Sequence, residues 1–123
     1  MNIHIKRVYE APDAGDGQRI LIDRLWPRGL AKSKAGIDLW LKDIAPSTEL
    51  RRWYGHDPER WSEFKKRYFS ELDAHPDAVA ELLERTAAGK VTLLFGSREE
   101  RWNNAHALAE YLQSRAARPA KKH

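Results

Sequence analysis

The sequence predicts a single small α/β domain, in which three or four strands form a sheet and helices pack against it. Its length of 123 residues corresponds to one domain. Two short apolar runs, at residues 20–22 and 91–95, are typical of strands buried in a sheet. Between them lie two segments with apolar residues three or four positions apart, which is the spacing of an amphipathic helix.

Residues 1–42 carry the signals of strands separated by turns. Residues 3–9 predict the first strand, and residues 10–17 are rich in Gly, Pro and Asp, which favours a turn. Residues 18–25 predict a second strand. Pro27 and Gly29 follow it and break the strand, because proline lacks an amide donor and glycine permits a left-handed turn. Apolar residues alternate over residues 37–42, which favours a short strand, although a helical turn is also compatible.

The rest of the chain predicts helices and one further strand. Ser47 is a suitable cap for a helix that ends before Gly55, and the pair Asp57-Pro58 is a second start signal. The aromatic face of this second helix is interpreted as core rather than as a stacking surface. A third helix starts at Pro76 and ends at Gly89. Residues 91–95 predict a strand buried on both faces, followed by a polar loop over residues 96–104 and a last helix.

The net charge of +4 arises at the C-terminus. Four of the 22 Lys and Arg residues lie at or after position 115, and the other 18 balance the 18 acidic residues. We therefore expect residues 1–114 to form the domain and residues 115–123 to be a basic, disordered tail. The tail lacks aromatic residues that could stack on bases, so the charge does not favour nucleic-acid binding.

Several classes of protein are excluded by composition. The chain has no cysteine, which excludes disulfides, a thiol nucleophile and a thiolate zinc site. Its five histidines show no metal-binding spacing, so we expect no metal. No apolar run approaches the roughly 18 residues of a membrane span, and the N-terminal residues do not resemble a signal peptide. We expect a cytoplasmic protein that does not associate with membranes.

The densest polar cluster follows the second predicted strand. It reads Asp23-Arg24-Leu25-Trp26-Pro27-Arg28-Gly29. Ligands of open α/β sheets bind at the carboxyl ends of strands, and two arginines can hold a phosphate or carboxylate. Trp26 could stack on a base or sugar. The structural alternative is that Asp23 pairs with an arginine, Trp26 fills the core and the rest is a rigid turn.

Two helix starts provide the other candidate ligands. Ser47 and Arg51 could bind an anion at the start of their helix, although for Ser47 the local sequence favours an ordinary helix cap. Asn103, Asn104 and His106, at the start of the last helix, could hydrogen-bond a ligand. If the protein is an enzyme, Asp23 or His106 is the candidate acid or base. We expect residues 23–29, the Ser47 helix start and the loop over residues 96–106 to converge on one cleft.

Motifs along the chain resemble the YeaO-like branch of the domain of unknown function 488 family. Besides the Asp23–Gly29 motif, the matching segments are Lys6-Arg7-Val8-Tyr9, Ala45-Pro46-Ser47, Leu50-Arg51, His56-Asp57-Pro58, Thr92-Leu93-Leu94 and Ala109-Glu110-Tyr111-Leu112. The resemblance implies a small bacterial or archaeal α/β domain with no assigned activity and no known cofactor. Thiol groups found in the wider family are absent here, so no thiol chemistry carries over.

Three functions are compatible with these observations. The first is binding of a small anionic ligand, such as a nucleotide or a phosphorylated metabolite, by Arg24, Trp26, Arg28, Ser47, Arg51 and Asn104. The second is a non-catalytic protein-interaction module that uses Trp26, Trp40 and Trp53 as anchors. The third is nucleic-acid binding through Arg24, Arg28, Lys32, Lys34 and the tail. The sequence assigns neither a reaction nor an oligomeric state.

Overall fold

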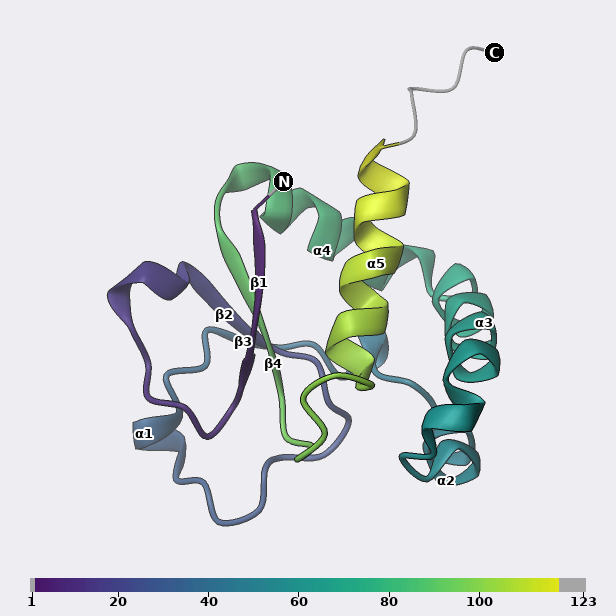
Figure 1. The fold of residues 1–123 in the computed structure, drawn as a ribbon. Coiled ribbons are helices and arrows are strands. Elements are labelled where there is room, and N and C mark those ends of the chain that lie inside the picture. The colour runs from purple at the N-terminus through teal and green to yellow at the C-terminus, as the bar shows by residue number, and fades with distance from the viewer. Residues whose placement is uncertain (1, 118–123) are drawn as a thin grey trace, which may run out of the picture.

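The computed structural model describes residues 2–117, without the side chain of Ala117. Four parallel strands form one sheet in the order β1-β4-β2-β3 (Figure 1). The strands are β1 (Ile3–Arg7), β2 (Gln18–Leu21), β3 (Leu39–Trp40) and β4 (Val91–Phe95). Leu93 in the central strand β4 is paired with Ile5 on one side and Ile20 on the other. This architecture confirms the predicted α/β class.

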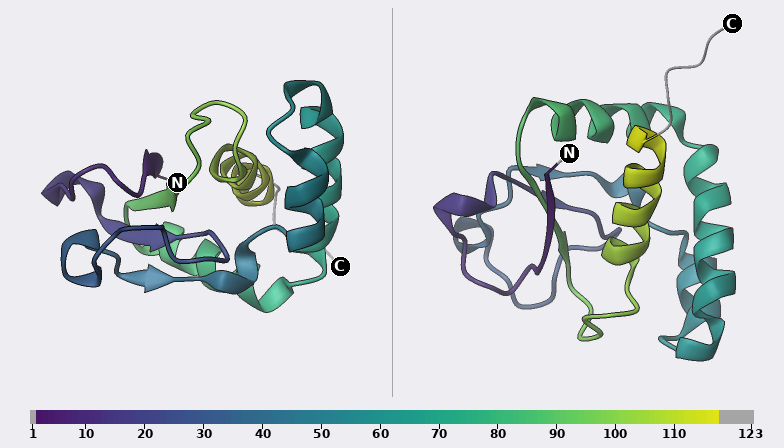
Figure 2. Two further views of the ribbon diagram at one scale, coloured as in Figure 1. Left: turned by 90° about the horizontal axis from the view of Figure 1, so that it is seen from below. Right: turned by 45° about the horizontal axis from the view of Figure 1, so that its top comes forward.

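Five α-helices surround the sheet. They are α1 (Lys32–Ala35), α2 (Thr48–Tyr54), α3 (Trp61–Asp73), α4 (Pro76–Ala88) and α5 (Asn104–Ala117). Three short 3-10 helices are η1 (Ala14–Asp16), η2 (Lys42–Ile44) and η3 (Pro58–Arg60). Helices α2 to α5 lie together on one side of the sheet, whereas α1 and its flanking segments lie on the other (Figures 1 and 2).

Alternating residues of the central strands face two separate cores. Ile20 of β2 and Leu93 of β4 point into the larger core, which includes the aromatic residues Phe64 and Tyr68 of α3. Their neighbours Leu21 and Leu94 point to the opposite face, where a smaller core contains Val8, Trp26, Leu30, Ile37 and Trp40. Every residue of β4 is buried, as expected for a strand covered on both faces.

Some element boundaries differ from the expected ones. Strand β1 ends at Arg7 and β2 at Leu21, before the expected ends at positions 9 and 25. Helix α1 was not predicted, because its four residues are too few to show a periodic pattern. Helix α5 includes positions 115–117 of the expected tail, and the Arg115 guanidinium donates to Asp73 Oδ1 at 2.6 Å. The remaining tail, residues 118–123, lies outside the described residues.

The direction of the strands determines where polar side chains can gather. All four strands run parallel, so the segments that follow β1, β2 and β4 leave from one edge of the sheet. The chain after β2 carries the Asp23–Gly29 motif, and the chain after β4 leads into α5. Helix α2 ends near the same loop, since the Tyr54 hydroxyl donates to the Trp102 carbonyl at 2.7 Å.

Candidate functional site

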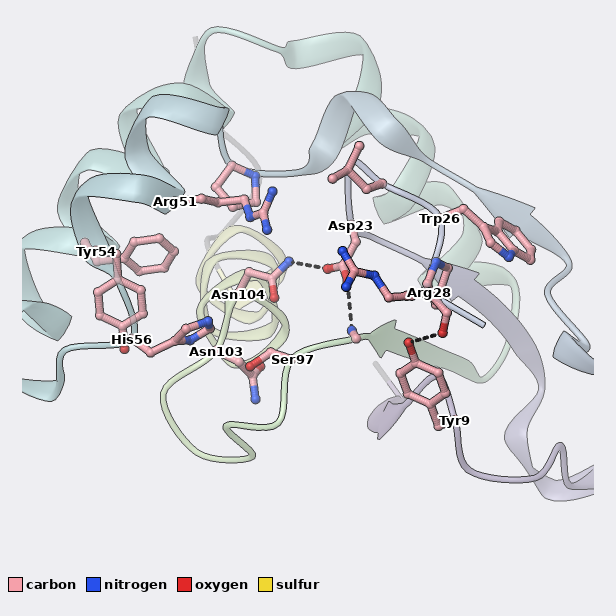
Figure 3. Close-up of a pocket in the computed structure, with 15 residues that line it drawn as sticks. Tyr9, Asp23, Trp26, Arg28, Arg51, Tyr54, His56, Ser97, Asn103 and Asn104 are labelled. Carbon is pink, nitrogen blue, oxygen red and sulfur yellow. Dashed lines mark hydrogen bonds between the residues drawn. The ribbon is translucent and has the colours of Figure 1, made fainter. Parts of the chain in front are cut away.

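A cavity of about 280 Å³ opens at the carboxyl edge of the sheet (Figure 3). Its lining comes from the segments after β1, β2 and β4 and from the region of α2. The lining residues are Tyr9, Asp23, Leu25, Trp26, Pro27, Arg28, Pro46, Arg51, Tyr54, His56, Phe64, Gly96, Ser97, Asn103 and Asn104. The expected convergence of the motif with the β4–α5 loop is therefore observed, and Pro46 and Arg51 bring the region of α2 to the same cleft.

Asp23 joins three parts of the cavity wall. Its Oδ2 accepts a 2.8 Å hydrogen bond from the Gly96 amide, and its Oδ1 accepts a 2.9 Å bond from the side-chain amide of Asn104. Burial raises the pKa of the Asp23 carboxyl, while these two hydrogen bonds and the charge of Arg51 act in the opposite direction. In the described part of the chain, no Lys, Arg or His nitrogen lies within 4.0 Å of this carboxylate. The pairing of Asp23 with an arginine, which is part of the structural alternative, is therefore not observed among the described residues.

Arg28 and Arg51 bring two positive charges to the cavity from different elements. Both guanidinium groups reach toward the Asp23–Asn104 pair, Arg28 from the loop after β2 and Arg51 from α2 (Figure 3). Neither side chain forms an ion pair or a hydrogen bond with another residue in the range 2–117. The Arg28 backbone is held in place by the Tyr9 hydroxyl, which donates to the Arg28 carbonyl at 2.9 Å. Among the described residues, these two cations face the cavity without a direct ion pair, and the nearby Asp23 carboxylate interacts with Arg51 only through longer-range electrostatics.

Aromatic residues form the opposite part of the cavity wall. Tyr54 stacks on Phe64 with ring centroids 4.4 Å apart, and its hydroxyl donates to the Trp102 carbonyl. Burial, together with the charges of Glu99 and Asp57, raises the pKa of Tyr54 to about 12, so the hydroxyl keeps its proton at neutral pH. His56 follows the C-cap of α2 and has a φ of 58°, a left-handed conformation that is uncommon for a residue other than glycine.

The start of α5 is held by side chains of the loop that precedes it. Asn103 Oδ1 accepts a hydrogen bond from the His106 amide at 3.1 Å, and its Nδ2 donates to the Glu99 carbonyl at 2.8 Å. The first bond caps the helix, since it satisfies one of the amides that lack a helical partner. The helix start is therefore fixed, and this places the Asn104 side chain beside Asp23.

The structure separates the predicted site residues into two groups. Asp23, Trp26, Arg28, Arg51 and Asn104 all line the cavity. Arg24, Ser47 and His106 do not. The Arg24 guanidinium faces the Ala45 carbonyl at 3.4 Å, and the His106 ring is 3.2 Å from Asn103 Oδ1.

Trp26 lines the cavity, but its ring belongs to the smaller core. The indole N–H donates to the Leu30 carbonyl at 2.7 Å, and the ring packs edge-on against Trp40 with centroids 5.4 Å apart. Lys32 lies over the ring, with its Nζ 5.8 Å from the ring centroid. These contacts favour a structural role for Trp26 in the smaller core rather than stacking on a ligand.

Ser47 acts as a helix cap whose groups are already occupied. Its Oγ accepts a bond from the Leu50 amide at 3.1 Å and donates to Glu71 Oε2 at 2.6 Å. The Ser47 amide also donates to Glu71 Oε1 at 2.8 Å. A carboxylate of the protein thus occupies the position in which an external anion was expected. The prediction of Ser47 as a ligand-binding residue is not supported by this geometry.

Among the cavity residues that were not predicted as ligand-binding or catalytic residues, four carry a hydroxyl or imidazole group: Tyr9, Tyr54, His56 and Ser97. Tyr9 and Ser97 each follow a strand, so the carboxyl-end rule that identified Asp23 could have found them. Tyr54 and His56 lie at the end of α2. The carboxyl-end rule does not identify these two residues, because their approach to the cavity depends on how α2 packs; His56 does lie in the motif His56-Asp57-Pro58, which carries part of the family resemblance.

Within residues 2–117, no group of three or more Asp, Glu or His side chains is arranged to hold a metal ion. No helix in the same range is long and apolar enough to cross a membrane.

Fold and site together define a small all-parallel α/β domain with a charged cleft at the carboxyl edge of its sheet. A family model described as "Inactive DUF488-N3 subclade" matches residues 2–123, and the chain belongs to this family. Two relatives support the assignment. The uncharacterized protein Rv3073c of Mycobacterium tuberculosis is 44% identical over 113 residues, which are 92% of this chain and 95% of the relative. The uncharacterized protein YeaO of Escherichia coli is 40% identical over 114 residues, which are 93% of this chain and 99% of the relative. No solved structure matches the chain.

Proposed function

We propose that the domain binds a small anionic ligand in the cleft and does not catalyse a reaction. One observation carries this proposal: Arg28 and Arg51 line the same cavity, and neither guanidinium forms an ion pair or hydrogen bond among the described residues. Arginines that converge from two elements suit a phosphate or carboxylate, because the planar guanidinium donates two parallel hydrogen bonds. The ligand would supply the missing negative charge.

Binding without catalysis is favoured by the candidate acid-base groups. His106 lies outside the cavity lining, and each oxygen of Asp23 accepts a hydrogen bond from the protein. These bonds hold Asp23 in place as part of the wall. The family to which the chain belongs is also described as an inactive subclade. A binding function needs only the shape and charge of the cleft.

Thermal unfolding with inorganic phosphate tests the proposal. A ligand that binds only the folded state stabilises it by RT ln(1 + [L]/Kd), about 1.4 kcal/mol at ten times the dissociation constant. For a domain of this size we expect the thermal midpoint to rise by about 5 °C. Chloride at the same ionic strength is the control, because salt alone screens charge repulsion.

Arginine variants test whether phosphate raises the thermal midpoint by binding in the cleft. Arg51→Ala should lose most of the increase, whereas Arg52→Ala should keep it. Arg52 is the next residue on α2 and is exposed, but it does not line the cavity. If phosphate gives no increase beyond chloride, or if both variants respond equally, the proposed anion site is wrong.

The protein-interaction alternative is supported by one observation. Leu25, in the centre of the motif, is 66% exposed, and Tyr9 beside the cavity is 43% exposed. Exposed apolar side chains at a cleft are a feature of interaction surfaces. If this alternative is correct, Leu25→Ser should abolish any concentration-dependent self-association seen by light scattering. The nucleic-acid alternative is less favoured, because Arg24 faces the Ala45 carbonyl and Lys32 and Lys34 lie on α1 outside the cavity.

A further inference from the structure

We infer that the ligand is a phosphorylated polyol of the size of a sugar, bound through its phosphate by Arg28 and Arg51 and through a hydroxyl group by Asp23. The inference rests on the proposed anion site and specifies what else the ligand must carry. The cavity wall presents a carboxylate beside its two cations, and a plain anion would leave that carboxylate without a partner from the ligand.

The hydrogen bonds of Asp23 define the group that can bind beside it. An ionised carboxylate has about four acceptor positions. Two are used, one on each oxygen, by the Gly96 amide and the Asn104 side chain. The remaining positions can only accept hydrogen bonds. A ligand group that contacts Asp23 must therefore be a donor, such as a hydroxyl or an amine.

The charge balance favours a neutral donor. Arg28 and Arg51 contribute two positive charges and Asp23 one negative charge. A ligand with an ammonium group at Asp23 would add a third positive charge close to Arg51, which already interacts electrostatically with this carboxylate. A hydroxyl group donates to Asp23 without adding charge, and a phosphate at the arginines then compensates the net positive charge.

The size and walls of the cavity favour a sugar over a nucleotide. A volume of about 280 Å³ lies just below the range of about 300–1,000 Å³ found for small-molecule sites. Two aromatic rings of the wall are engaged within the protein, since Tyr54 stacks on Phe64 and Trp26 packs against Trp40. The exposed Tyr9 ring already has the Arg7 guanidinium over it, 5.1 Å from the ring centroid. A nucleobase would need more volume and an aromatic face to stack on, whereas a polyol needs neither.

Calorimetric titration of the full chain with three compounds tests the inference. The compounds are inorganic phosphate, butyl phosphate and ribose 5-phosphate, compared at one ionic strength. Butyl phosphate is the matched control, because it has a phosphate ester and a carbon chain but no free hydroxyl group. We expect ribose 5-phosphate to bind wild-type protein at least about tenfold more tightly than butyl phosphate, which corresponds to one hydrogen bond to a charged group.

The Asp23→Asn variant assigns the preference to one residue. It should reduce the difference between the two esters to less than about threefold, while butyl phosphate binds as in the wild type or more tightly, because a negative charge is removed. The wild-type comparison remains decisive if this variant does not fold.

The possible outcomes separate the inference from the proposed function. If both esters bind wild-type protein equally, the polyol inference is wrong and the anion site stands. If Asp23→Asn keeps the full preference, Asp23 is not the hydroxyl acceptor. If none of the three compounds binds, the proposed function itself fails.

Discussion

The side-chain amide of Asn104 donates a 2.9 Å hydrogen bond to Asp23, although 81 residues separate the two positions in the chain. This bond connects the segment after β2 to the first residue of α5. The second oxygen of Asp23 accepts from the Gly96 amide just after β4. One carboxylate therefore fixes the relative positions of two strand ends and a helix start, and these three segments form the wall of the cavity.

The Asp23 carboxyl should make stability depend on pH. Its pKa is raised by burial above the ordinary value of 3.8, so the folded state binds more protons than the unfolded state between these two pKa values. The stability of the wild type should fall, relative to that of Asp23→Asn, as the pH rises from 3.8 through the raised pKa. Urea unfolding of both proteins at several pH values between about 4 and 7 measures this difference. A difference that is constant, or that grows in favour of the wild type, would contradict the prediction.

Ser47→Ala should destabilise the fold without weakening phosphate binding. The substitution removes the cap of α2 and the 2.6 Å bond to Glu71, which we expect to cost about 1–2 kcal/mol. Ser62→Ala, an exposed serine on α3, is the control and should change the free energy of unfolding by less than about 0.5 kcal/mol. If a folded Ser47→Ala protein no longer responded to phosphate, the result would contradict this prediction and show that Ser47 takes part in anion binding.

Gly17→Ala should be far more destabilising than Gly29→Ala. Both glycines have positive φ, 66° and 76°, so both substitutions introduce backbone strain of about 1 kcal/mol or more. Only at Gly17 would the new Cβ also collide with backbone, since it would lie 2.3 Å from the Lys90 carbonyl oxygen, whereas nothing lies within 4 Å at Gly29. Denaturant unfolding of the two variants measures the difference. Equal losses would show that the turn before β2 can move away from Lys90.

The sequence predicts an element well when the residues that determine its ends lie within it or next to it. The α2 helix begins after Ser47 and ends at Gly55, and β4 spans the predicted residues 91–95. In both cases the responsible groups lie within or next to the element: a hydroxyl that caps the first turn, a glycine in the left-handed conformation, and an uninterrupted apolar run.

Features that depend on distant partners were not predicted. Ser47 was considered for anion binding because nothing in its neighbourhood shows that Glu71, 24 positions away, reaches the same amide and hydroxyl. Trp26 was considered as a stacking group because its packing against Trp40 depends on the path of the loop between them. Arg24 and Arg28 were equivalent in the sequence, and only the fold directs Arg24 to the Ala45 carbonyl and Arg28 to the cavity.

The most direct test of the central claim is a titration of isotope-labelled protein with inorganic phosphate, followed by the chemical shifts of its amides and arginine side chains. Phosphate at the cleft should shift the amides of Gly96, Ser97 and Asn104 and the Nε–H signals of Arg28 and Arg51 in a saturable manner. The signals of Lys32 and Lys34 on α1 should stay at their positions in a chloride titration of equal ionic strength. Saturable shifts confined to α1, or no shifts beyond those caused by chloride, would contradict a ligand site at the carboxyl edge of the sheet.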